Sequence, residues 1–204
     1  MIWDLNNLSG CVAARMSESR FAHTLGVLKM AKLLSDFCLP EHVEQISAAA
    51  LLHDVTKELS HDEQVRILKK CDVVLPYDVD KCPQVLHSFT APLIIRNEFE
   101  VYATKEILSA VEKHTIGSED MSVFDEIIFI SDYAEEGRNY SNCIKVREYM
   151  LSSMKNGEIE SNCTILHKAC LVAIENTISH LKSKDAFIAP EVYLAKKALE
   201  TKII

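Results

Sequence analysis

The sequence is poor in the residues that interrupt helices. Only five glycines and five prolines occur in 204 residues, and long stretches are rich in alanine, leucine, glutamate, lysine and isoleucine. These residues favour helices, whereas the period-2 alternation of strands is not found. We therefore expect an all-α fold, a helical bundle of one domain over residues 1–204, with no repeat or linker dividing it.

Positive charge is also scarce. The chain has 22 Lys+Arg against 30 Asp+Glu, which gives a formal net charge of −8. Overall charge therefore does not favour nucleic acid or an anionic membrane as a partner. The sequence has no apolar run long enough to span a bilayer and does not start with a signal-peptide pattern. We expect a cytoplasmic protein whose anionic substrates need a local positive site, and a homodimer is left open.

Paired cysteine motifs are missing as well. Seven cysteines occur without a C-x-x-C pair, and Cys38, Cys143 and Cys170 lie among apolar residues of helical pattern. We interpret them as reduced structural thiols.

Helix boundaries are marked by capping residues and turns. Ser60 and Glu63 form a capping-box pattern, and so do Ser122 and Asp125. The apolar period and these signals predict helices over 17–37, from about 40 to 53, from 60, from about 83, over 105–114 and from 123 towards 137, followed by helices that break at 156–157 and 185–190. We expect a core of about 17–140 against which helices in 141–204 pack.

Five ionisable residues fall on the apolar faces of five predicted helices. They are His23, His53, His87, His114 and Asp132. A single inward histidine is usually a core residue with a backbone partner, but a helical core has few spare partners for five such groups. Convergence on a metal ion would satisfy them together. Imidazole and carboxylate ligands suit Fe, Mn, Zn, Ni or Co, and the absence of cysteine weighs against structural zinc.

The dipeptide His-Asp occurs twice, with different meanings. His61-Asp62 lies in the Ser60 capping box, where the helix dipole favours an aspartate. His53-Asp54 ends a buried helix, where a carboxylate is unfavourable without a cation. Asp54 can bridge to a second ion, so one or two ions are expected.

The order of these residues resembles the HD superfamily of metal-dependent phosphohydrolases and, within it, the YqeK-type family. The blocks that carry this resemblance are Arg20–Val27, Leu51–Lys57, Leu86–Ser88, Glu112–Gly117 and Ile128–Arg138. The family usually has glycine at Ser88, threonine at Ile116 and Ile-Glu-Pro at Ala134-Glu135-Glu136. The resemblance implies an all-helical HD domain that uses iron to cleave diadenosine tetraphosphate symmetrically into two ADP.

The resemblance also implies the roles of individual residues. His23, His53, Asp54 and Asp132 would hold the first metal ion, with His23 also near the phosphates. His87 and His114 would face a second ion or the phosphate chain. Asp54 would orient a hydroxide generated by metal binding, and His87, His114 and Lys57 would join it in catalysis.

Charge develops on the phosphoryl oxygens as the anhydride bond breaks, so cations are expected around them. Arg20, Lys57 and Arg138 lie close in sequence to the ligands and are the candidates. Without the resemblance each would be interpreted as an exposed cation. Thr24 and Thr115 are candidate hydrogen-bond donors to phosphate. A base could stack on Tyr133, Tyr140 or Phe89.

Three alternatives remain open from the sequence. An HD hydrolase could act on a nucleoside monophosphate, a cyclic nucleotide or a guanosine polyphosphate. A non-catalytic helical module could sense a metal or a nucleotide. A plain helical scaffold would bind no metal and would not respond to chelators.

Overall fold

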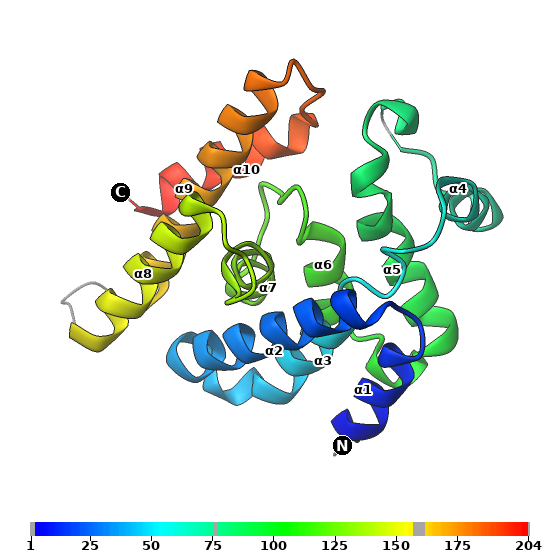
Figure 1. Cartoon of the computed structure of the whole chain (residues 1–204), viewed down its shortest axis with the longest axis horizontal. Helices are drawn as coiled ribbons and strands as arrows, with labels where there is room; N and C mark the ends of the chain where they lie inside the picture. The colour runs from blue at the N-terminus through cyan, green and yellow to red at the C-terminus, as the bar shows by residue number, and fades with distance from the viewer. Residues whose placement is uncertain (1–2, 76, 157–161, 204) are drawn as a thin grey trace.

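The computed structural model describes residues 3–75, 77–156 and 162–203. Across these residues the chain forms α-helices joined by turns and 3-10 helices, with no strand, which confirms the all-α prediction (Figure 1). The α-helices of this described part are α1 (Leu5–Ala13), α2 (Glu18–Cys38), α3 (Val43–Leu52), α4 (His61–Lys70), α5 (Leu86–Glu98), α6 (Lys105–Lys113), α7 (Val123–Ala134), α8 (Ser141–Asn156), α9 (Asn162–Ser183) and α10 (Pro190–Ile203).

The predicted caps determine where several helices begin. The Ser17 side chain caps α2, and both predicted capping boxes form, Ser60 with Glu63 at α4 and Ser122 with Asp125 at α7. Each serine oxygen accepts a backbone N–H that has no partner within the helix. Local hydrogen bonding therefore determines these three boundaries.

Other boundaries differ from the prediction. Short 3-10 helices at Pro40–His42 and Pro83–Val85 precede α3 and α5. Helix α7 ends at Ala134 instead of continuing towards Gly137, because Glu135 adopts an extended conformation and its buried carboxylate turns back to α2. Helix α1 was not predicted, and Gly157 lies outside the described residues.

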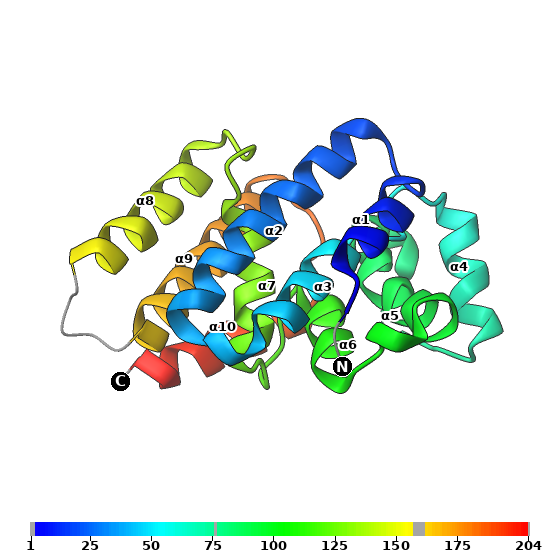
Figure 2. The ribbon, with the colours of Figure 1, turned by 90° about the horizontal axis from the view of Figure 1, so that it is seen from below.

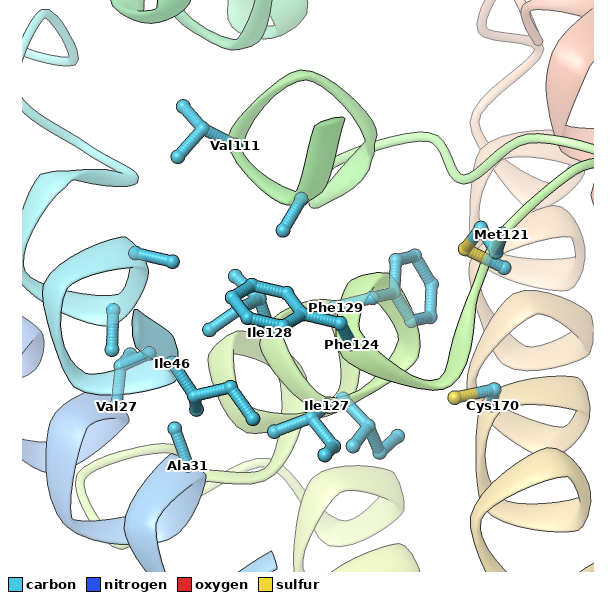
Figure 3. Packing of buried hydrophobic residues seen from close by; sticks show 14 of the residues in the cluster. Val27, Ala31, Ile46, Val111, Met121, Phe124, Ile127, Ile128, Phe129 and Cys170 are labelled. Atoms are coloured by element: carbon cyan, nitrogen blue, oxygen red, sulfur yellow. The ribbon is translucent and has the colours of Figure 1, made fainter. Parts of the chain in front are cut away.

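Helix α7 is the centre of the fold. Nine of its twelve residues are buried, so it has no solvent-facing stripe of the kind that surface helices carry. Figure 3 shows Phe124, Ile127, Ile128 and Phe129 pointing in different directions from this helix, towards α2 and α3 on one side and α9 on another. The side chain of Asp132 belongs to the same helix, so this core determines where that carboxylate lies.

Two groups of helices lie at opposite ends of the molecule. Helices α8, α9 and α10 form one side, and α4 and α5 lie at the opposite end of the molecule (Figures 1 and 2). Helix α9 packs against α7, α8 and α10. Within the described ranges, none of the helices has the length and apolarity required to cross a membrane.

Candidate metal centre

Asp54 lies at the centre of a cluster of histidines. The chain leaves α3 through tight turns in which the Val55 N–H donates to the Leu52 carbonyl and the Lys57 N–H donates to the Asp54 carbonyl. These turns keep Asp54 next to the C-terminal end of α3, where it is buried with 3% of its surface exposed. A carboxylate buried this deeply needs compensating cations or donors.

Two of the histidines are positioned by the same kind of local hydrogen bond. His53 follows α3 and His114 follows α6, each as the helical C-cap residue. The Nδ1–H of His53 donates to the Ala50 carbonyl at 2.7 Å, and that of His114 donates to the Val111 carbonyl at 2.6 Å. A carbonyl can only accept, so the proton is on Nδ1 and the lone pair of each Nε2 is directed into the cluster.

The first donor set surrounds one oxygen of Asp54. Its Oδ2 lies 3.4 Å from His53 Nε2 and 3.7 Å from His23 Nε2. Asp132 Oδ1 approaches the same nitrogens, at 2.9 Å from His23 and 4.0 Å from His53. His53 is fully buried, whereas the side chains of His23 and Asp132 are 11% and 21% exposed, so the set opens to solvent on the α2 and α7 side.

The second donor set surrounds the other oxygen of Asp54. Its Oδ1 lies 3.3 Å from His87 Nε2 and 3.7 Å from His114 Nε2, and the two imidazole nitrogens are 3.0 Å apart. The Thr115 hydroxyl lies 3.0 Å from His114 Nε2 and 3.2 Å from His87 Nε2. Asp54 is thus shared between two sets of donors from five segments of the chain.

The cluster strongly perturbs the pKa values of its members. Burial would raise the pKa of Asp54, but His53, His114 and His87 outweigh burial and hold it well below its usual value. Burial, with the nearby His114 and Lys57, holds the pKa of His87 well below its usual value. Burial opposes a charged His53, yet Asp54 and Asp132 raise its pKa. The carboxylates are therefore ionised and His87 is neutral at pH 7.

The donor chemistry fits a bound cation. His23 Nε2 and His53 Nε2 are buried without a hydrogen-bond partner among the described residues, although carboxylate oxygens lie near both. In the neutral imidazoles these lone pairs face negative oxygens, an arrangement that a proton or a metal ion between them would stabilise. Among the described residues, the ligand atoms of His23, His53 and Asp54 lie within 4.8 Å of one another, and so do those of Asp54, His87 and His114.

All three predicted cations lie at the edge of the cluster. Arg20 Nη1 donates to Asp54 Oδ2 at 2.9 Å, and Arg138 Nη2 donates to Asp132 Oδ1 at 2.8 Å. Lys57 Nζ lies 3.3 Å from His87 Nδ1 and donates to the Gln84 carbonyl. Burial lowers the pKa of Lys57, and Asp54 and Asp132 partly offset this effect.

The structure does not bring Thr24 into the cluster. Thr24 is fully buried and its hydroxyl lies against Met16 Sδ, on the side of α2 that packs into the core. It follows His23 directly in the sequence, but adjacent helical residues point about 100° apart. The proximity in sequence that suggested a phosphate contact therefore does not translate into proximity in space.

Glu135 contacts the cluster and was not a sequence-based candidate. Glu135 is 3% exposed, and its Oε1 lies 3.1 Å from His23 Nδ1, within hydrogen-bond distance. Its other oxygen, Oε2, accepts from the Gly137 N–H. Arg147 of α8 holds this loop by donating to the carbonyls of Ala134, Glu135 and Arg138. The sequence signal that could have found it is the Ile-Glu-Pro run of the YqeK-type family, whose glutamate falls at Glu135.

A cavity of about 520 Å³ adjoins the cluster between α7, α8 and α9. Its walls include Asp132 and Arg138 at the cluster end, Tyr133 and Tyr140, and Asn176 and His180 of α9. Phe89, the third aromatic residue considered for base stacking, is not among the lining residues. The volume lies in the range of small-molecule sites.

The fold and cluster define a helical protein with two His/Asp donor sets around a shared aspartate. The chain belongs to the HD domain family, whose model matches residues 20–137. This match confirms the family resemblance and covers every proposed ligand.

Two relatives agree with this family. The chain is 27% identical over 185 residues to "Bis(5'-nucleosyl)-tetraphosphatase, symmetrical" of Bacillus subtilis (strain 168), covering 90% of this chain and 91% of the relative. The protein of the same name from Halalkalibacterium halodurans is 27% identical over 184 residues, 88% of each chain. These relatives and the family make the chain an HD-domain hydrolase related to symmetrical tetraphosphatases.

The fold itself is shared with a crystal structure from Clostridium acetobutylicum, described as a predicted HD superfamily hydrolase involved in NAD metabolism. The TM-score is 0.83 at 24% identity, over 99% of this chain and 100% of the other. At this identity the likeness establishes the fold alone.

Proposed function

We propose that this protein hydrolyses diadenosine tetraphosphate symmetrically, giving two ADP, with iron as its metal. The observation that carries the proposal is Asp54, whose two oxygens face separate histidine sets while arginines approach the cluster from its edge. The names of the two relatives support the tetraphosphate as substrate. The resemblance to the YqeK-type family is the reason for naming iron.

His23, His53, Asp54 and Asp132 would hold one ion, and Asp54, His87 and His114 would hold a second. A bound ion would supply Lewis-acid chemistry and lower the pKa of the attacking water. Asp54 is the group that orients this water, because it is the acceptor nearest to both sets. The buried Nδ1–H bonds of His53 and His114 hold their rings in place throughout.

The cations of the cluster would neutralise the phosphate chain. Arg20 and Arg138 pair with Asp54 and Asp132, and both arginine side chains are partly exposed, so a phosphate would approach them from solvent. Lys57 and Thr115 are placed near His87, where they would donate to a phosphoryl oxygen. Hydrogen bonds from such donors stabilise the charge that develops in the transition state.

The cavity between α7, α8 and α9 would take one nucleoside of the substrate. Arg138 lies both in its wall and at the metal cluster, so a phosphate chain could pass from one to the other. Tyr133 and Tyr140 offer aromatic surface to a base, and Asn176 offers an amide. This placement makes the two ends of the substrate chemically distinct when bound.

The test is product analysis by chromatography. Protein loaded with iron is incubated with diadenosine tetraphosphate, with mono-, cyclic and guanosine polyphosphates in parallel reactions. Two ADP without AMP or ATP is the expected result. Hydrolysis of another substrate alone, or binding of metal without any turnover, would overturn the proposed substrate or the proposed catalysis respectively.

The two His-Asp dipeptides provide matched variants. Asp54→Asn should lose metal and hydrolysis together, by about 10³-fold in rate, because an amide is a weaker ligand than a shared carboxylate. Asp62→Asn makes the same change in the exposed capping box and should leave both unchanged. Turnover at the normal rate in Asp54→Asn would contradict the proposal.

A further inference from the structure

We infer that Glu135 is a positioning residue that keeps the proton of His23 on Nδ1, so that the Nε2 lone pair points into the metal cluster. The inference rests on the proposed function in one respect, namely that His23 is a metal ligand. Glu135 contacts the cluster through His23 and belongs to neither donor set. It acts only through His23, from the side of the ring opposite to Asp132.

Each oxygen of Glu135 lies within hydrogen-bond distance of a nitrogen atom. His23 Nδ1 lies 3.1 Å from Oε1, and the Gly137 N–H donates to Oε2. The backbone donor cannot change its role. An ionised carboxylate can only accept, so Nδ1 must be the protonated nitrogen of His23 in this arrangement.

The space around Glu135 is shaped for a carboxylate in this position. A Cβ atom on Gly26, one turn after His23 in α2, would lie 3.0 Å from the Glu135 Cδ and closer still to Oε2. A Cβ atom on Gly137 would lie 2.9 Å from Oε1 and 3.0 Å from Oε2. Two glycines therefore leave the room that the carboxylate occupies between α2 and the loop after α7.

The loop that carries Glu135 is held independently of His23. Arg138 N–H donates to the Glu135 carbonyl at 3.0 Å, and Arg147 Nη1 donates to the Ala134 carbonyl at 3.1 Å. The Gly137 N–H is therefore fixed in direction, whereas a proton on an imidazole can move from one nitrogen to the other. This difference decides what a glutamine would do at position 135.

Glu135→Gln is expected to place its amide oxygen towards the fixed Gly137 N–H. Its NH₂ group then faces His23 Nδ1, which must accept, and the imidazole proton moves to Nε2, where it blocks ligation. Glu135→Ala removes the same charge but leaves room for water, which accepts from Nδ1–H as the carboxylate does. A comparison of the two variants therefore distinguishes the effect of the His23 tautomer on metal binding from the effects of lost charge and altered packing.

The experiment measures the affinity of the metal-free protein for Co²⁺ by its visible absorption, in competition with a chelator. Glu135→Gln should weaken binding by about 10–100-fold, the range known for residues that orient metal-ligating histidines, and Glu135→Ala should weaken it less. Glu136→Gln is the matched control, because Glu136 is exposed and pairs with Lys29. The melting temperature of the metal-free Glu135→Gln protein should equal that of the control.

Gly26→Ala tests the same inference by a change in α2, on the helix that packs against Glu135. Its added methyl group should displace the Glu135 carboxylate and weaken Co²⁺ binding in the wild-type background, but should add little in the Glu135→Ala background. Wild-type affinity in Glu135→Gln, or a larger loss in Glu135→Ala than in Glu135→Gln, would overturn the inference. Failure of the wild-type protein to bind Co²⁺ would instead overturn the metal site of the proposed function.

Discussion

Arg138 lies between the donor cluster and the cavity. Its contacts make it possible to test substrate binding apart from metal binding. Nη2 donates to Asp132 Oδ1 at 2.8 Å and Nε donates to the Asp132 carbonyl at 3.1 Å. The guanidinium group is itself a cation and cannot bind a metal ion. The arginine therefore orients Asp132 while it remains available to a phosphate.

Arg138→Ala is expected to retain bound metal and to lower kcat/KM by about 10²–10³-fold, the usual effect of removing one donor to a developing negative charge. Metal content and initial rates on the same preparation measure the two effects. Arg66→Ala, on the exposed face of α4, is the control. Loss of metal together with activity would contradict the role given to Arg138.

Single residues could be predicted where they break a pattern. His23, His53, His87, His114 and Asp132 interrupt apolar helical faces, and this is why the sequence singled them out. Glu135 breaks no pattern, because a glutamate beside Glu136 and Gly137 resembles any solvent-exposed turn. Its role depends on α2 lying against the loop after α7, a contact between segments more than one hundred residues apart.

At the scale of elements, a buried ion pair fastens α10 to α7. Glu126 of α7 is fully buried, and its oxygens accept from Lys202 Nζ at 2.6 Å and from His167 Nδ1 of α9. Lys202 also donates to the Met121 carbonyl. One carboxylate thus connects three helices in the half of the molecule that walls the cavity.

Lys202→Met should lower the free energy of unfolding by about 2 kcal/mol, because it leaves the buried carboxylate with one partner fewer. The Lys202 side chain is 32% exposed, so the effect should be smaller than for a fully buried pair. Urea denaturation measures the change. Lys197→Met removes an exposed lysine from the same helix and should have little effect, and equal losses in both variants would refute this account.

Helix boundaries could be predicted from the sequence where a side chain caps the helix. The prediction failed where a tertiary contact determines the boundary. Ser17, Ser60 and Ser122 marked three helix starts correctly. The end of α7 was wrong by three residues, because the periodic pattern continues while Glu135 turns to a distant histidine. The packing of α10 onto Glu126 has no local signal at all.

At the scale of the whole molecule, the donor sets connect α2, α3, α5, α6 and α7. A metal ion held by residues from several helices stabilises only the folded chain, since the unfolded chain does not bring the ligands together. Metal binding should therefore be visible as global stability. The scaffold alternative makes the opposite prediction.

Chelation is expected to lower the melting temperature by about 5–10 °C. An ion present at 100 times its Kd stabilises the folded state by about 2.7 kcal/mol, and a chain of this size shifts by about 2–4 °C per kcal/mol. Scanning calorimetry with and without EDTA measures the shift, and readdition of iron should reverse it. The Asp54→Asn protein should hardly respond, and an unchanged wild-type melting temperature would favour the scaffold.

The buried thiols predict how stability depends on alkaline pH. Burial, followed by the nearby Glu126, raises the pKa of Cys170 well above its usual value, and burial with Cys163 and Glu126 raises the pKa of Cys38 to about 12. An unfolded thiol ionises near pH 9. Below that pH both states keep the proton and the stabilisation is complete, whereas at higher pH only the unfolded state ionises.

The free energy of unfolding should therefore fall as pH rises from about 9 towards the pKa of the folded thiols, by up to about 1.4 kcal/mol per pH unit for each thiol. Lysines and tyrosines also titrate in this range, so the difference between variants is the informative quantity. Cys170→Ala should make the slope shallower under reducing conditions, whereas Cys11→Ala, at an exposed position, should not. Parallel slopes for wild type and Cys170→Ala would show that the folded protein does not keep this thiol protonated.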